Sequence, residues 1–434
     1  MRIHFRFLAV FLLLLSGFWP SGLLAAPSAA GTRGFDAVKP DLTLLRETLR
    51  ASGVTDPARS LVYETSFLEL VSGLEREVGR THSAYRRARK LHQALHQRIL
   101  RRYVSTADGL DAVLERGEFN CLSASLLYGM VARSFGLDVQ VVEIPRHVYV
   151  RLFVDQRRIE VESTSRTGFD LRPKLDLGTT SLSDPGYGSN AAGAGVLPPL
   201  SGTLPEGVDL ERAVGFLWHN RGRRALEEGE ALRAARAFLE ESRLQPAGST
   251  PSETLGMFLA RAFRVAYEAG NFEDAYRIAE IGIQILPGQT TARDRLLAAA
   301  LKRIESILES GHVSEAEEVL NLTGSTVGKP VDLRRLERGA CPLIAAAAVR
   351  SEDWALASRM ARRFAIAEPD RVESNRLSLW VARREREVHA SLGHNACSEM
   401  SPLFLDDGES QFLSDSRTAV PPDPSPSTAD PTRD

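Results

Sequence analysis

Cysteine is scarce in this chain of 434 residues, which holds only Cys121, Cys341 and Cys397. None of them lies in a Cys-x-x-Cys pair, so the sequence lacks both the usual spacing of a structural zinc site and a dithiol redox motif. We therefore expect no metal site. Because the number is odd, at least one thiol is free within a single chain. Cys341 and Cys397 can form a disulfide in an oxidising compartment, or they can be two buried helical thiols.

The chain also lacks a strong net charge and a long hydrophobic run. The net charge is −2, which gives no reason to expect a nucleic-acid partner. The apolar run at residues 7–15 follows Arg2 and Arg6, is soon interrupted by Pro20, and is too short to span a bilayer. With the small residues at 28–30, this pattern is typical of a signal peptide over residues 1–30. We expect an exported protein, periplasmic or extracellular, with membrane attachment only if this segment is not cleaved.

The length predicts two or three domains. Apolar residues at helical spacing predict helices within residues 40–105, and a linker rich in Gly, Ser and Pro covers residues 171–208. The Pro-, Ser- and Asp-rich residues 414–434 are expected to be a disordered tail. These boundaries predict one domain over residues 40–170 and a second over residues 209–405.

Residues 117–164 carry the chemistry of the first domain. A helix is expected over residues 121–135, and strands over 139–144, 147–154 and 158–162. The alternation of side chains places His147, Tyr149 and Arg151 on one face of the second of these strands. If the hairpin pairs residues of the same parity class as 149 and 162, His147 and Glu162 share a face, whereas a slip of one residue separates them.

These residues are the components of a cysteine nucleophile. A helix N-terminus and a neighbouring imidazole can both stabilise a thiolate at Cys121, and His147 is the histidine available to act as its base. A carboxylate such as Glu162 would fix the imidazole tautomer. Backbone N–H groups near Cys121, with the Asn120 side chain, could hold an oxyanion. A buried structural cysteine and a structural strand histidine are the alternative reading.

After residue 209 the sequence becomes a series of helical repeats. Small residues and a proline recur at matching offsets, and the distance from the central alanine to the proline is the same from Ala234 to Pro246, Ala275 to Pro287 and Ala357 to Pro369. A fourth unit around Ala316 lacks the proline. A weaker fifth helix pair is expected over residues 375–404. Repeats of this kind bury their faces on their neighbours, so a stacked solenoid of tetratricopeptide type is predicted.

The motif region resembles the transglutaminase-like superfamily of papain-like cysteine enzymes. Cys121 at a helix start corresponds to the family nucleophile, His147-Val148-Tyr149 resembles its His-Ala-Trp strand motif, and residues 161–164 (Val-Glu-Ser-Thr) resemble its Val-Asp-Pro-Thr. The segment from residue 110 to 137 is similar to a bacterial subgroup in which this core precedes tetratricopeptide repeats. Glu162 stands where the family has Asp, and some members of that subgroup lack the cysteine.

The resemblance implies an α+β transglutaminase-like core, with helices on a small antiparallel sheet, followed by an all-α tetratricopeptide-repeat solenoid. It further implies a cysteine hydrolase or acyltransferase that acts on peptide or amide substrates through a thioester, without a cofactor, while the repeats bind a protein or peptide partner. The alternative is a non-catalytic interaction scaffold built from the same two parts. Export and amide chemistry together also suggest a role on peptidoglycan.

Overall fold

The computed structural model describes residues 38–79, 81–171, 205–245, 253–368 and 370–394. The predicted signal peptide, the predicted linker up to residue 204, the predicted tail and Cys397 lie outside these residues. Within the described part of the chain, no helix is both long and apolar enough to cross a membrane.

The first domain opens with four helices whose limits follow from their capping residues. They are α1 (Leu42–Ser52), α2 (Pro57–Val78), α3 (Ala84–Arg98) and α4 (Leu110–Arg116). The side chains of Asp41, Asp56 and Ser83 each accept a backbone N–H in the first turn of the following helix. Gly53 and Gly117 end α1 and α4 in the left-handed conformation. The helices predicted within residues 40–105 are present, although α3 ends at Arg98 and the last residues of that range are not helical.

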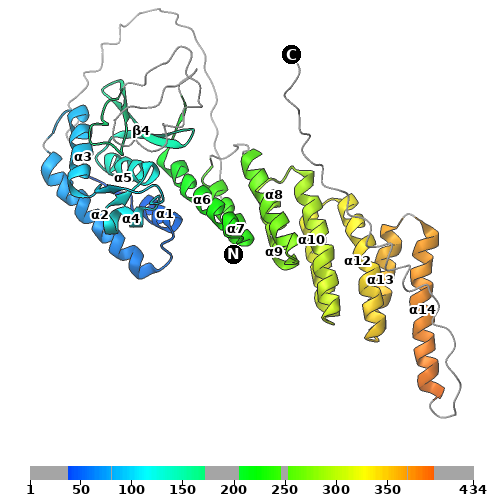
Figure 1. Ribbon diagram of the computed structural model, residues 1–434. Helices are drawn as coiled ribbons and strands as arrows, with labels where there is room; N and C mark the ends of the chain where they lie inside the picture. The colour runs from blue at the N-terminus through cyan, green and yellow to red at the C-terminus, as the bar shows by residue number, and fades with distance from the viewer. Residues whose placement is uncertain (1–37, 80, 172–204, 246–252, 369, 395–434) are drawn as a thin grey trace, which may run out of the picture. The chain divides into compact units, whose positions relative to one another are not determined.

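Helix α5 (Cys121–Ser134) forms the centre of this domain and is buried along most of its length. Its small residues allow close approach to neighbouring elements. A Cβ atom on Gly129 would lie 2.5 Å from Leu210 Cδ2, so a larger residue here would force the Leu210 side chain to move. The Ser125 hydroxyl donates to the Val148 carbonyl of the adjacent sheet. Figure 1 shows α5 beside strand β4. The helix is therefore held in place from both sides.

The main sheet is antiparallel and has the strand order β5-β4-β3-β6. Its strands are β3 (Asp138–Ile144), β4 (His147–Val154), β5 (Arg157–Val161) and β6 (Gly207–Val208). Arg151 pairs with Glu160 across the β4–β5 hairpin, which is the register that puts His147 and Glu162 on one face. The structure thus decides between the two registers that the sequence left open.

Two strand pairings were not predicted. Gly207 and Val208, which the sequence analysis placed in the linker, pair with β3 as β6, so the chain rejoins the sheet before the repeats begin. A parallel pair, β1 (Arg102–Tyr103) and β2 (Glu118–Phe119), runs beside the start of α5. Strands of two residues carry too little periodicity to be recognised from sequence.

The rest of the described chain is a series of helices that pack on their neighbours. They are α6 (Leu210–Glu227), α7 (Ala231–Arg243), α8 (Glu253–Glu268), α9 (Phe272–Ile285), α10 (Thr290–Glu309), α11 (Val313–Val327), α12 (Pro330–Arg350), α13 (Trp354–Ala367) and α14 (Arg371–His394). The alanines of the predicted motif are buried where helices meet. The fifth pair is corrected in part, because α14 is one continuous helix up to residue 394 and the remainder of that prediction lies outside the described residues.

The repeat length is 41 residues. The turn between the two helices of successive units contains Gly229, Gly270, Gly311 and Glu352, each 41 positions after the one before and each with positive φ. Glycine suits this conformation, and Glu352 adopts it with strain. A tetratricopeptide unit has about 34 residues. The described helices are thus a solenoid of longer helical pairs.

The first repeat helix is joined to the first domain by specific contacts. The Trp218 indole N–H donates to Glu47 at 3.1 Å, and its ring lies 4.8 Å from the guanidinium carbons of both Arg50 and Arg221. Arg224 forms an ion pair with Asp108. Because α6 contributes to the packing of both parts, the first repeat stabilises the domain that carries Cys121.

Candidate functional site

Cys121 is the first residue of α5, and its side chain is partly exposed. The backbone dipoles of a helix give its first turn a partial positive charge, which stabilises an anion at this position. The N–H groups of Leu122 and Ser123 are used by the helix cap, whereas the Cys121 N–H has no hydrogen-bond partner among the described residues. That N–H is thus available to an atom bound beside the sulfur.

Asn120 serves mainly as the cap of this helix. Its Oδ1 accepts from the N–H groups of Leu122 and Ser123, and its Nδ2 donates to the Ser105 carbonyl at 3.1 Å. The Ser123 hydroxyl completes a capping box with the Asn120 N–H. The Asn120 side chain, which was predicted from the sequence as a possible oxyanion donor, is therefore occupied by structural hydrogen bonds.

His147 and Glu162 are in direct contact. The Nε2 atom of His147 lies 2.5 Å from Glu162 Oε2. The other carboxylate oxygen of Glu162 accepts hydrogen bonds from the Thr164 hydroxyl at 2.5 Å and the Thr164 N–H at 3.1 Å. Glu162 is almost fully buried, so these bonds fix its orientation. The extra methylene of Glu relative to Asp does not prevent contact with the imidazole.

The same imidazole also interacts with the Cys121 side chain, which acts on its pKa. Because Nε2 is bonded to Glu162, Nδ1 is the ring nitrogen left for the sulfur. Burial alone would lower the pKa of His147, but the interactions with Cys121 and Glu162 and their negative charges outweigh it and raise the pKa to about 10. Burial acts to raise the pKa of Glu162, yet the contact with His147 and the Thr164 bonds lower it. At neutral pH these shifts favour a protonated His147 beside an ionised Glu162.

Two further histidines, His92 and His96 on α3, lie behind the loop that carries Glu162. They are buried, and their rings stack edge to face with centroids 4.8 Å apart. Burial, together with the charge of His96, lowers the pKa of His92 to about 4. These histidines are therefore neutral at physiological pH, and the His92 ring packs against Phe169, which follows the loop.

Sequence reasoning missed the residues that position Glu162. Thr164 was quoted only as part of the family resemblance, although a threonine two residues after an acidic residue can hydrogen-bond back to it. Gly168 approaches Glu162 closely, and a Cβ atom there would lie 2.2 Å from the Glu162 carbonyl oxygen. The Glu162 N–H donates to the Gly168 carbonyl at 2.8 Å. The loop from 162 to 168 is therefore closed tightly on the carboxylate.

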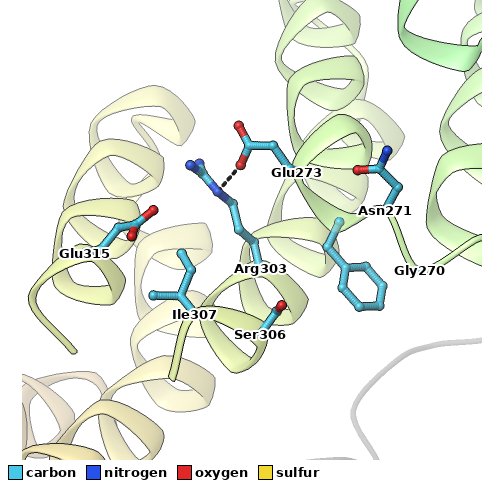
Figure 2. Close-up of a pocket in the computed structure, with 8 residues that line it drawn as sticks. Gly270, Asn271, Glu273, Arg303, Ser306, Ile307 and Glu315 are labelled. Carbon is cyan, nitrogen blue, oxygen red and sulfur yellow. Dashed lines mark ion pairs between the residues drawn. The ribbon is translucent and has the colours of Figure 1, made fainter. Parts of the chain in front are cut away.

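A separate hollow lies on the repeats, between α9, α10 and α11 (Figure 2). Its lining residues are Gly270, Asn271, Phe272, Glu273, Arg303, Ser306, Ile307 and Glu315. Arg303 forms an ion pair with Glu273, and its guanidinium lies over the Tyr276 ring at 5.0 Å. The residues that line this hollow include no cysteine and no histidine, so the candidate chemistry belongs to Cys121. Among the described residues, no group of His, Cys, Asp and Glu side chains is arranged to hold a metal ion.

No protein-family model matches the sequence, and no curated protein matches it either.

Proposed function

We propose that the protein is a cysteine-dependent amide hydrolase or acyltransferase of transglutaminase-like type, with Cys121 as nucleophile. The observation that carries the proposal is the position of His147, which is bonded to Glu162 and interacts with Cys121 at a helix N-terminus. A thiolate needs a nearby proton carrier and an electropositive position, and this arrangement supplies both.

The reaction follows from the charges of the three groups. The Cys121 thiolate attacks the carbonyl carbon of an amide, a bond forms between sulfur and carbon, and the carbonyl electron pair moves to oxygen. The imidazolium of His147 donates its Nδ1 proton to the leaving nitrogen as the C–N bond breaks. The product is a thioester on Cys121, and ammonia or an amine leaves. Water or a primary amine, deprotonated by the now neutral His147, then attacks the thioester and restores the thiolate.

The helical repeats extend this proposal to a protein or peptide substrate. Stacked helical pairs form long surfaces that commonly bind peptides. The first repeat is joined to the domain of Cys121 through Trp218 and Arg224, so a chain bound along the repeats would be tethered to that domain. Export, as the N-terminal sequence suggests, would place such a substrate outside the cytoplasm. The repeats would then present the substrate, while Cys121 carries out the reaction.

The proposal is tested with a digest of casein, which provides many glutamine and backbone amides, and dansylcadaverine as an amine acceptor. Labelled peptides report transfer, released ammonia reports deamidation, and new peptide termini report cleavage. We expect at least one of these products from the wild-type protein and none from Cys121→Ser. His147→Asn should be strongly impaired, because it removes the proton carrier but keeps a polar side chain of similar size.

The result also separates the proposal from a binding scaffold. If no product forms from casein or from muropeptides, although Cys121 is reactive towards alkylating reagents, amide transfer is not the function. If Cys121→Ser, which retains the fold, binds partners as the wild type does and no activity depends on the thiol, the scaffold interpretation is supported instead.

A further inference from the structure

Tyr103 is held beside the candidate nucleophile by the small parallel sheet. The register of β1 and β2 sets Tyr103 opposite Phe119, two residues before Cys121. The Val104 N–H donates to the Phe119 carbonyl at 2.8 Å, and the Ser105 carbonyl accepts from Asn120 at 3.1 Å. The chain from 103 to 105 is therefore bonded to the residues that lead into α5, and its position relative to the start of that helix is fixed.

The side chain of Tyr103 is placed to meet a ligand. It is 45% exposed, and its ring contacts Phe119 edge to face with centroids 6.1 Å apart. Its hydroxyl has no hydrogen-bond partner among the residues that the structure describes. Partial burial, with the negative charges of Cys121 and Glu162, raises the pKa of this phenol. The hydroxyl therefore stays protonated and can donate a hydrogen bond.

An acyl-transfer site needs donors for the oxygen that becomes negative in the transition state. The Cys121 N–H is one, and the Asn120 amide is used in the helix cap. We propose that the Tyr103 hydroxyl is the second donor of this oxyanion site, which makes Tyr103 a catalytic residue. The inference rests on the proposed function. As the bond between sulfur and carbon forms, the oxyanion accepts from both donors without a proton transfer, and its electron pair reforms the carbonyl when the leaving group departs.

The test compares two reagents that make different demands on the site. p-Nitrophenyl acetate acylates the thiolate through an oxyanion and releases nitrophenolate, whereas iodoacetamide alkylates it by displacement of iodide, with no oxyanion. Rates are measured at Cys121 by mass spectrometry of its peptide, with Cys121→Ser as the background. In Tyr103→Phe, which keeps the ring contact with Phe119, we expect acylation to fall about 100-fold and alkylation to stay within about twofold.

Tyr267→Phe is the matched control, since Tyr267 lies on α8 in the repeats, and it should change neither rate. An unchanged acylation rate in Tyr103→Phe would overturn the inference. An equal loss of both rates would also overturn it, because Tyr103 would then affect the reactivity of the Cys121 thiol and not the oxyanion. Failure of the proposed function looks different, because wild-type Cys121 would then be inert to both reagents or, if it is reactive, would give no product from casein or muropeptides. If Tyr103→Phe is unfolded by circular dichroism, Tyr103→Trp, which retains an aromatic ring and an N–H donor, should keep more acylation than Tyr103→Leu.

Discussion

Replacement of Glu162 by glutamine tests the part of the site that departs from the related family. The change keeps the size of the side chain and removes its charge. The 2.5 Å contact with His147 Nε2 would then be made by a neutral amide. If that amide donates its N–H to Nε2, the neutral imidazole carries its proton on Nδ1 and can no longer accept one from Cys121.

The size of the effect follows from the energy of a charged hydrogen bond. Such a bond in a buried site is worth about 1.5–3 kcal/mol. At about 1.4 kcal/mol for each pKa unit, its loss lowers the pKa of His147 by roughly one to two units from its raised value near 10. The imidazolium and thiolate pair loses the same free energy, so we expect the alkylation rate of Cys121 at about pH 7 to fall roughly 10- to 100-fold.

The assay is iodoacetamide alkylation of Cys121 from pH 5 to 10, followed by mass spectrometry. Glu162→Asp is the control, because it keeps the charge but shortens the side chain by one methylene. Its rate should lie between those of the wild type and Glu162→Gln. If Glu162→Gln reacts as fast as the wild type across this range, Glu162 does not stabilise the imidazolium, and the reasoning is refuted.

Three further predictions use the same structure. Gly168→Ala places a Cβ atom 2.2 Å from the Glu162 carbonyl oxygen and should slow alkylation of Cys121 at least tenfold. The control Gly288→Ala, whose Cβ atom would have no atom within 4 Å, should leave the rate unchanged. Equal rates in the two variants would contradict the proposed support of Glu162. The raised pKa of His147 means that its stabilising contribution is complete below about pH 6.5 and is lost as the pH rises towards 10. The difference in the free energy of urea unfolding between wild type and His147→Gln should therefore shrink from about pH 6 to 9.5. A difference that grows over this range would contradict a raised pKa of His147. Gly222→Ala puts a Cβ atom 2.4 Å from the Phe238 ring and should reduce stability by about 1–3 kcal/mol in thermal unfolding, against little change for Gly288→Ala.

Local patterns predicted the helix and the strands of the hairpin, because alternation along β4 and β5 is a property of neighbouring residues, but they left two registers open. The order of Cys121, His147 and Glu162 along these elements was enough to suggest a site. The capping role of Asn120 was also readable, since Asn at a helix start with Ser three residues later is a typical cap. The recurrence of Gly229, Gly270 and Gly311 could also be read from the sequence.

Other features depend on contacts between distant residues. His92 and His96 lie on a helix that precedes Cys121, and only the folded chain brings them behind Glu162. Tyr103 meets Phe119 through strands of two residues, which have no sequence signature. Strand β6 pairs with β3 after the long segment that follows Leu171. In each case the partner is set by tertiary packing, which local propensity does not encode.

The most direct test of the central claim is the reactivity of Cys121 in folded and unfolded protein at about pH 6.5, where an ordinary thiol is largely protonated. Iodoacetamide is added with and without urea, and the Cys121 peptide is quantified by mass spectrometry. Buried Cys341, whose pKa burial raises to about 12, serves as the internal reference. The account predicts that Cys121 reacts faster in the folded protein than in urea, while Cys341 reacts only in urea. Slower reaction of Cys121 in the folded protein would contradict it.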